Sequence, residues 1–134
     1  MKQKTTTRND HQERINEVLF QIHLDTQRNF SVEELALHVA MSPFHFNRVF
    51  KEIVGESVHA YSKRVKLEHA ANSLIFSPQI TITQAMQEVG FSSNASFSQG
   101  FKEYFGVTPT KWREIDRANE HRDFAFANKP LHVT

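Results

Sequence analysis

Several polar side chains in this sequence carry hydrogen-bonding groups that match the edges of nucleic-acid bases. Asn47 and Arg48 occupy one segment, and Asn94 and Gln99 occupy a second segment further along the chain. An arginine guanidinium can donate two hydrogen bonds to O6 and N7 of guanine, and the amides of Asn and Gln can pair with N6 and N7 of adenine. These side chains form hydrogen bonds but are not nucleophiles or general bases. They therefore indicate a role in recognising nucleic acid and not in catalysis.

The two segments are copies of one sequence pattern. Residues 46–55, FNRVFKEIVG, return as residues 97–106, FSQGFKEYFG, and each copy is followed by a small polar residue and then by an aromatic residue. A chain that repeats one helical unit is suited to a target that also repeats. Duplex DNA, which offers one major groove per turn, is the target that this repeat predicts.

Helical periodicity predicts which side chains of each copy face outwards. At 100° per residue, the large apolar residues define a buried side, made of Phe46, Val49, Phe50 and Ile53 in the first copy and Phe97, Phe101 and Tyr104 in the second. The outward side and the positions that flank it carry the predicted contacts with bases, which are Phe44, His45, Asn47, Arg48, Asn94, Ala95 and Gln99. Ser96 lies beside them. Four basic residues are the predicted contacts with phosphates: Lys51, Lys102, Lys63 and Arg64.

Signals for the start and the end of helices place these faces on short helices. Ser31 with Glu34 and Thr81 with Gln84 form capping boxes, and a glycine follows each repeated segment. We therefore predict an all-α fold of about seven helices, in which two helix-turn-helix subdomains are joined by a long linker helix. The first unit is predicted at 31–54, the linker helix at 57–76, the second unit at 81–105 and the whole domain at 10–115, with a first helix from Asp10 to Asp25.

The linker helix has a length suited to duplex DNA. About twenty residues at 1.5 Å each span roughly 30 Å. Adjacent major grooves on one face of DNA lie about 34 Å apart. A single chain can therefore place both repeated segments in successive grooves without forming a dimer.

Both ends of the chain lie outside the predicted domain. Residues 1–9 are polar and basic, and we expect them to form a disordered arm. Residues 116–134 form either a tail or the start of a further domain, because apolar residues alternate at 124–126 as they do in a strand. The start of a further domain is our hypothesis for this segment.

Composition excludes several classes of function. The chain has no cysteine, which excludes disulfides and thiolate metal sites, and its eight histidines lack the spacing of metal ligands. We therefore expect no cofactor and no metal. The chain also lacks a nucleophile–base pair and a phosphate loop, so we expect no enzymatic activity. No apolar run reaches membrane length, and a cytoplasmic, nucleoid-associated protein is expected.

The net charge of +1 is distributed unevenly along the chain. Six acids and two bases lie in residues 10–41, whereas five bases and two acids lie in residues 42–66. A protein with one basic face can bind phosphate although its total charge is nearly neutral. The acidic first helix is either a solvated face or a surface for a protein partner such as RNA polymerase, and both alternatives stay open.

Residues 31–113 resemble the DNA-binding domain of the AraC/XylS family of transcription regulators. The matches are densest in the second unit, at Ile82, 89–93 (VGFSS), Phe97, 101–102 (FK), 105–109 (FGVTP) and 112–113 (WR). Residues 66–70, KLEHA, are similar to the R-L-x-x-A motif of the family's linker helix. The resemblance implies a bacterial, sequence-specific regulator, expected to be an activator, that binds double-stranded DNA as a monomer at asymmetric promoter sites. Carried over by position, it implies base contacts at Phe44, Asn47, Arg48, Asn94, Ala95, Ser96 and Gln99. Some relatives carry an effector-binding domain after the DNA-binding domain.

The sequence departs from the family pattern at two places in the second unit. Ala85-Met86 replaces the usual Ile-Ala, and Gln99 replaces the Arg or Lys often seen in the second recognition helix. We therefore expect the second unit to discriminate less sharply between bases, or to act partly through DNA shape. The alternative function is a protein-interaction module that keeps this fold and no longer reads DNA.

Overall fold

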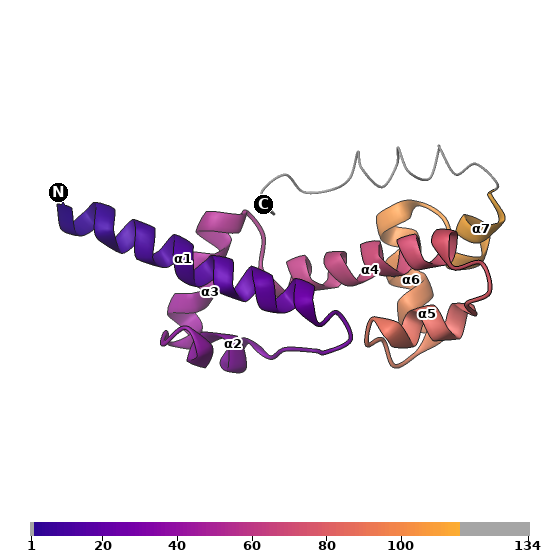
Figure 1. Ribbon diagram of the computed structural model, residues 1–134, viewed down its shortest axis with the longest axis horizontal. Coiled ribbons are helices and arrows are strands. Elements are labelled where there is room, and N and C mark those ends of the chain that lie inside the picture. Colours follow the sequence, from indigo (N-terminus) through magenta and orange to yellow (C-terminus); the bar gives the residue numbers. More distant parts are fainter. Residues whose placement is uncertain (1, 116–134) are drawn as a thin grey trace. The chain divides into compact units, whose positions relative to one another are not determined.

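The computed structural model describes the backbone of residues 2–115 and the side chains of residues 8–115. Within these residues all regular structure is helical, which confirms the predicted all-α class. Figure 1 shows the order of the helices: α1 (Lys2–Leu24), α2 (Val32–His38), α3 (Pro43–Val54), α4 (Val58–Phe76), α5 (Ile82–Glu88), α6 (Asn94–Phe105) and α7 (Pro109–Glu114). The tail predicted at 116–134, with its proposed strand, lies outside the described residues.

The helices divide between two compact units. Within the described residues, the first unit contains residues 2–25 together with Asn29–Lys63, and the second contains Thr26–Arg28 together with residues 64–115. Each unit holds one of the two helix-turn-helix pairs, α2 with α3 and α5 with α6, at the positions predicted from the capping signals. The linker helix α4 contributes residues to both units.

The two helix-turn-helix pairs begin in the same way. The amide of Glu34 donates to Ser31 Oγ at 3.0 Å, and the amide of Gln84 donates to Thr81 Oγ1 at 3.0 Å. Both capping boxes are complete, because the side chains of Glu34 and Gln84 also accept from the amides of their capping residues. The local sequence signals therefore fix the start of α2 and of α5.

The turn between the helices is left-handed in both pairs, but different residues occupy it. Ala40 has φ of +57° in the first pair, and Gly90 has φ of +76° at the matching position in the second. A side chain at positive φ meets the backbone, so this conformation is less favourable for alanine than for glycine. The first turn is therefore the strained copy of the two.

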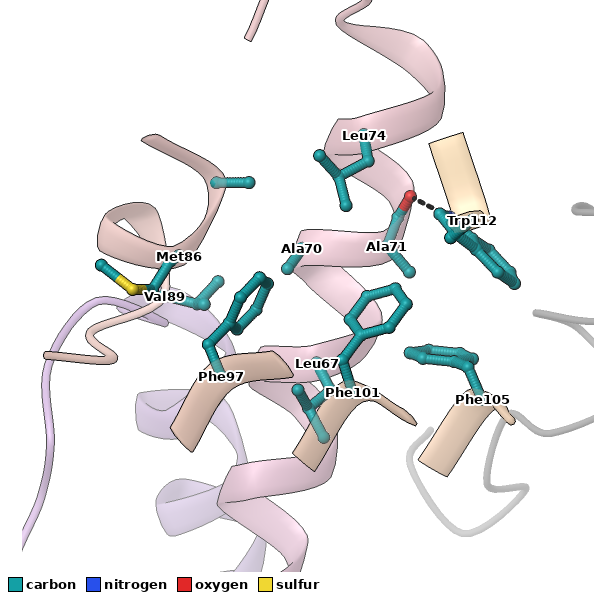
Figure 2. Close-up of a cluster of buried hydrophobic side chains, with 11 residues drawn as sticks. Leu67, Ala70, Ala71, Leu74, Met86, Val89, Phe97, Phe101, Phe105 and Trp112 are labelled. Carbon is teal, nitrogen blue, oxygen red and sulfur yellow. Dashed lines mark hydrogen bonds between the residues drawn. The ribbon is translucent and has the colours of Figure 1, made fainter. Parts of the chain in front are cut away.

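Each unit is built around a stack of aromatic rings. In the first unit Phe50 lies between Phe46 and Tyr61, with ring centroids 5.8 and 5.9 Å apart. In the second unit Phe101 lies between Phe97 and Trp112, at 5.7 and 5.8 Å. Figure 2 shows the second stack packed on Leu67, Ala70 and Ala71 of α4. The repeated phenylalanines are core residues, which agrees with the side that periodicity defined as buried.

Tyr61 and Trp112, the last residue of each stack, each have a polar group with a hydrogen-bond partner inside the same unit. Tyr61 Oη lies 2.7 Å from His23 Nε2 on α1. Trp112 Nε1 donates to the carbonyl oxygen of Ala71 at 3.0 Å, as the dashed line in Figure 2 shows. Satisfying these buried groups avoids the cost of removing an unpaired donor from water.

The structure corrects two details of the sequence analysis. Helix α1 begins at Lys2, not at Asp10, because residues 2–9 contain neither proline nor glycine to interrupt the helical backbone. Ile53 and Tyr104, which were predicted to be buried, are half-buried, and Val54 and Phe105 are buried in their place. The buried rows follow a spacing of four, 46–50–54 and 97–101–105, since side chains four apart stack on one face of a helix.

Candidate nucleic-acid interface

Helix α3 holds the first set of predicted base contacts. Ser42 caps the helix by accepting a hydrogen bond from the amide of His45 at 3.1 Å, and Gly55 ends it with φ of +94°. Between these ends, Phe44, Asn47 and Arg48 are exposed. The large apolar side chain of Phe44 is 79% exposed. The outward face therefore combines hydrogen-bonding groups with an available apolar group.

The charged group of Arg48 on this face is held only by an exposed ion pair. Arg48 Nε lies 3.9 Å from Glu52 Oε1, and the two side chains are 62% and 69% exposed. An ion pair this exposed contributes little to stability. The guanidinium can therefore leave Glu52 for another acceptor at small cost, while Lys51 is exposed on the adjacent turn.

His45 differs from the other predicted base contacts of α3 because it is only half-exposed. Its ring packs edge-on against His11 of α1, with centroids 5.3 Å apart and planes at 73°. The structure thus places His45 at the border between the outward face of α3 and helix α1. Helical periodicity contains no signal for this contact, because the contact joins two different helices.

Helix α6 holds the second set. Ser93 caps the helix by accepting from the amide of Ser96 at 3.0 Å, and Gly106 ends it with φ of +83°. Asn94, Ala95, Ser96 and Gln99 are all exposed, as predicted, and so is Lys102. Gln99 Nε2 donates to Glu103 Oε2 at 3.5 Å. This pair occupies the positions that Arg48 and Glu52 occupy in α3, but its donor is neutral.

The two basic residues predicted on α4 lie in different surroundings. Lys63 is exposed, whereas the side chain of Arg64 is 12% exposed and its Nη1 lies 3.8 Å from Glu68 Oε2. The same Glu68 oxygen accepts a hydrogen bond from Tyr104 Oη at 2.9 Å. Arg64 thus belongs to a network between α4 and α6, and this position favours a structural role over a phosphate contact.

The network also changes the acidity of Tyr104. Burial, and then the neighbouring Glu68 carboxylate, raise the pKa of the Tyr104 hydroxyl above its ordinary value. Sequence reasoning missed this network because it treated Tyr104 as an apolar core residue. The hydroxyl of a buried tyrosine needs a hydrogen-bond partner, and the carboxylate of Glu68 on α4 could have been predicted as a candidate.

A second surface of the first unit lies on α1 and α2. A shallow groove of about 530 Å³ is lined by Glu13, Asn16, Glu17, Phe20, Gln21 and His38. Phe20 is 63% exposed, and Leu24, one turn further along α1, is 67% exposed. The groove therefore combines the acidic side chains of Glu13 and Glu17 with one exposed apolar side chain, Phe20.

Neither a metal-binding cluster nor a membrane-spanning helix is found among the described residues. Among them, no group of three His, Asp or Glu side chains is placed to hold a metal ion. None of the helices between residues 2 and 115 has the length and apolar character needed to cross a membrane.

Comparison with protein families identifies the fold. The family model described as a helix-turn-helix domain matches residues 35–115. Among curated proteins, the Probable transcriptional regulator LumQ of Photobacterium leiognathi is 35% identical over 103 residues, which cover 75% of this chain and 41% of LumQ. The chain spans less than half the length of the curated relatives that it matches.

Solved structures agree with this match. A protein described as a probable AraC family transcriptional regulator from Rhodopseudomonas palustris has a TM-score of 0.70 and 27% identity, over 78% of this chain and 98% of that one. The DNA-binding domain of AdpA, solved in complex with a target DNA, has a TM-score of 0.68 at 24% identity, over 81% of this chain and 93% of that one, and shares the fold. The chain therefore belongs to the AraC-type helix-turn-helix family of DNA-binding transcription regulators, which are not enzymes.

Proposed function

We propose that this chain binds duplex DNA in a sequence-specific manner by inserting α3 and α6 into two successive major grooves. The observation that carries the proposal is the common design of these helices. Both bury a row of apolar side chains at a spacing of four and expose polar side chains opposite to it. The AdpA domain, which shares this fold, was solved on its target DNA, and that supports the same use of the fold here.

The two helices are proposed to read different sequences. The exposed face of α3 carries Phe44, Asn47 and Arg48, and that of α6 carries Asn94, Ala95, Ser96 and Gln99. An arginine favours guanine, whereas an amide favours adenine. The site is therefore asymmetric, and a single chain occupies it without a partner subunit.

Linker helix α4 is proposed to set the spacing between the two contacts. Its 19 residues, at a rise of 1.5 Å each, give a length of roughly 28 Å. This length is comparable to the separation of about 34 Å between adjacent major grooves on one face of the duplex. Lys51, Lys63 and Lys102, which are all exposed, would contact phosphates and fix the position of the protein on DNA.

A protein-interaction module with the same fold is the alternative. Such a module would expose apolar patches on α3 and α6, since docking faces bury apolar surface. Only Phe44 among the large exposed apolar side chains of the described residues lies on either face. The polar character of both faces favours DNA as the target.

We further propose that the protein acts as a transcription activator in the bacterial cytoplasm, with the groove on α1 and α2 as its contact for RNA polymerase. Glu13 and Glu17 at the rim would repel DNA and attract a basic protein segment, while Phe20 offers an apolar anchor. Phe20→Ala with Glu17→Gln should lower transcription in vitro with bacterial RNA polymerase and leave DNA affinity unchanged. Full activation by this double variant would exclude the groove from that role.

The direct test of the proposed function is binding to DNA recovered from a random pool. The proposal expects a recovered duplex to bind at nanomolar concentrations, with an affinity that falls steeply as salt is added. Failure to enrich any sequence, together with equal affinity for all duplexes, would favour the interaction module instead.

A further inference from the structure

We propose that Tyr104, Glu68 and Arg64 are positioning residues, which set the orientation of α6 and so determine how sharply the second unit discriminates between bases. The inference rests on the proposed function and deepens it. It assigns a role in specificity to residues that lie outside the exposed face of α6, and none of the three side chains has to touch DNA for this role.

The apolar contacts of α6 define its orientation only loosely. Phe97, Phe101 and Phe105 form the buried row of this helix, and Figure 2 shows the row beside α4. Burial of apolar surface is favourable but non-directional, so it specifies the rotation of a helix less tightly than a hydrogen bond does. A directional contact between α6 and α4 would select one orientation.

Tyr104 supplies a directional contact of this kind. It lies in the last turn of α6, and its Oη donates to Glu68 Oε2 on α4 at 2.9 Å. Its ring packs edge-on against Phe105, with centroids 4.7 Å apart and planes at 87°. Burial, and then Glu68, raise the pKa of the hydroxyl, so the donated proton stays in place at neutral pH. The hydrogen bond thus joins the end of α6 to the linker helix.

Arg64 holds the acceptor of this hydrogen bond. Its Nη1 lies 3.8 Å from the same oxygen of Glu68, one turn away on α4, and both side chains are mostly buried. Solvent and salt screen such a pair less than an exposed one, such as Arg48 with Glu52 in α3. The carboxylate is therefore confined between Arg64 and Tyr104.

The matching position of the first unit cannot form this contact. Ile53 of α3 corresponds to Tyr104 in the repeated sequence, and its side chain has no hydrogen-bond donor. Helix α3 packs instead against α1, where the ring of His45 meets that of His11. Loss of the Tyr104 contact should therefore affect only the half of the DNA site proposed for α6.

Orientation should matter more for α6 than for α3 because the central donor of α6 is neutral. Gln99 would recognise adenine through two aligned hydrogen bonds of its amide, whereas Arg48 in α3 also carries a charge. Binding groups function when they are held within about 0.5 Å and about 10–20° of the productive geometry. A rotation of α6 beyond this range would misalign the Gln99 amide.

The test changes each side of the hydrogen bond in the whole chain. Tyr104→Phe keeps the ring and removes the donor, and Glu68→Met removes the acceptor with a side chain of similar length. Glu68→Gln is the matched control, because its amide oxygen can still accept from Tyr104. Binding to a duplex recovered from a random pool, and to duplexes with single base changes in it, measures discrimination in each half of the site.

Tyr104→Phe and Glu68→Met should each lower discrimination in the α6 half by about fivefold and leave the α3 half unchanged. Glu68→Gln should keep most of the discrimination of the parent. The double variant Tyr104→Phe/Glu68→Met should lose no more than either single variant, because both changes remove one interaction. A smaller folded fraction would weaken binding to all duplexes equally, so it would not alter these ratios.

Discrimination like that of the parent in Tyr104→Phe, or an equal loss in both halves of the site, would overturn the inference. So would a loss in Glu68→Gln as large as that in Glu68→Met. If circular dichroism shows that Tyr104→Phe does not fold, the comparison of the two Glu68 variants decides the question. A parent that recovers no second block of preferred bases would instead contradict the proposed function, so the two failures can be told apart.

Discussion

Arg48 and Glu52 face each other across one turn of α3, with Nε and Oε1 3.9 Å apart and both side chains largely exposed. The matching positions in α6 hold Gln99 and Glu103, at 3.5 Å. Each of these two helices thus keeps its central donor beside a carboxylate, and only the donor in α3 is charged. This difference is the structural basis for expecting the two halves of the DNA site to differ.

Glu52 should compete with DNA for the side chain of Arg48. Glu52→Gln removes a carboxylate that holds Arg48 and repels phosphate, so affinity for duplex DNA should rise severalfold at low salt, with little change in stability. Glu103→Gln in α6 is the matched control, since it removes the same charge and releases no cation. Fluorescence anisotropy with a labelled duplex would measure both, and an equal rise for the two variants would show that Glu52 has no specific relation to Arg48.

Ala40→Gly should stabilise the first unit. Ala40 has φ of +57°, a conformation that glycine tolerates better, so the free energy of unfolding should rise by about 0.5–1 kcal/mol. Hydrogen exchange at the amides of α3 would report the change. Gly90→Ala at the matching position should lower protection in α6, and protection that fell in the Ala40→Gly variant would contradict the assigned strain.

The hydrogen bond between Trp112 and Ala71 should stabilise the second unit. Trp112→Phe keeps an aromatic ring in the core and removes the donor, which should cost about 1 kcal/mol in addition to the effect of the smaller ring. Chemical denaturation followed by circular dichroism would measure the loss. Trp112→Phe should leave base preference unaltered, because Trp112 is buried away from the exposed face of α6.

Lys66 should tie the segment 26–28 to the second unit. Its ammonium group is almost fully buried and donates to the carbonyl oxygens of Thr26 and of Arg28, the latter at 2.9 Å. Lys66→Met fills the same space and leaves both acceptors without this donor, so a loss of about 1–3 kcal/mol is expected. Lys66→Arg should be milder, and similar unfolding curves for Lys66→Met and the parent would show that the contact contributes nothing.

The raised pKa of Tyr104 should make the free energy of unfolding depend on pH in alkaline solution. The pKa of its hydroxyl is raised in the folded chain, so the folded state holds this proton more tightly than the unfolded state. The contribution of this hydroxyl to stability is complete below pH 10.0, the ordinary pKa of tyrosine, and is lost as pH rises above that value. Tyr104→Phe should flatten the fall in stability on the alkaline side, and an unchanged pH profile would remove Tyr104 as its source.

The sequence was sufficient for the parts of the fold that local signals determine. Capping boxes at Ser31 and Thr81 and glycines at 55 and 106 mark helix ends by backbone chemistry, and the structure has helix ends at those places. Periodicity likewise predicted that Asn47, Arg48 and Gln99 would be exposed. These features depend on residues within a few positions of one another.

The features that were missed depend on contacts between segments far apart in the chain. The ring contact of His45 with His11, the burial of Lys66 under residues 26 and 28, and the network of Arg64 with Glu68 and Tyr104 each join different segments. A helical pattern read from one segment contains no information about such partners. The extra turns of α1 before Asp10 were missed for a related reason, since polar residues without an apolar row give no periodic signal.

The most direct test of the account is parallel selection from a random DNA pool with the parent chain and with Arg48→Ala. We predict that the parent enriches an asymmetric site with two blocks about one helical turn apart. Arg48→Ala should lose preference, by about 1–3 kcal/mol, at one base pair of a single block and keep the other block intact. A symmetric site, or a loss spread equally over both blocks, would contradict the claim that α3 and α6 read different sequences.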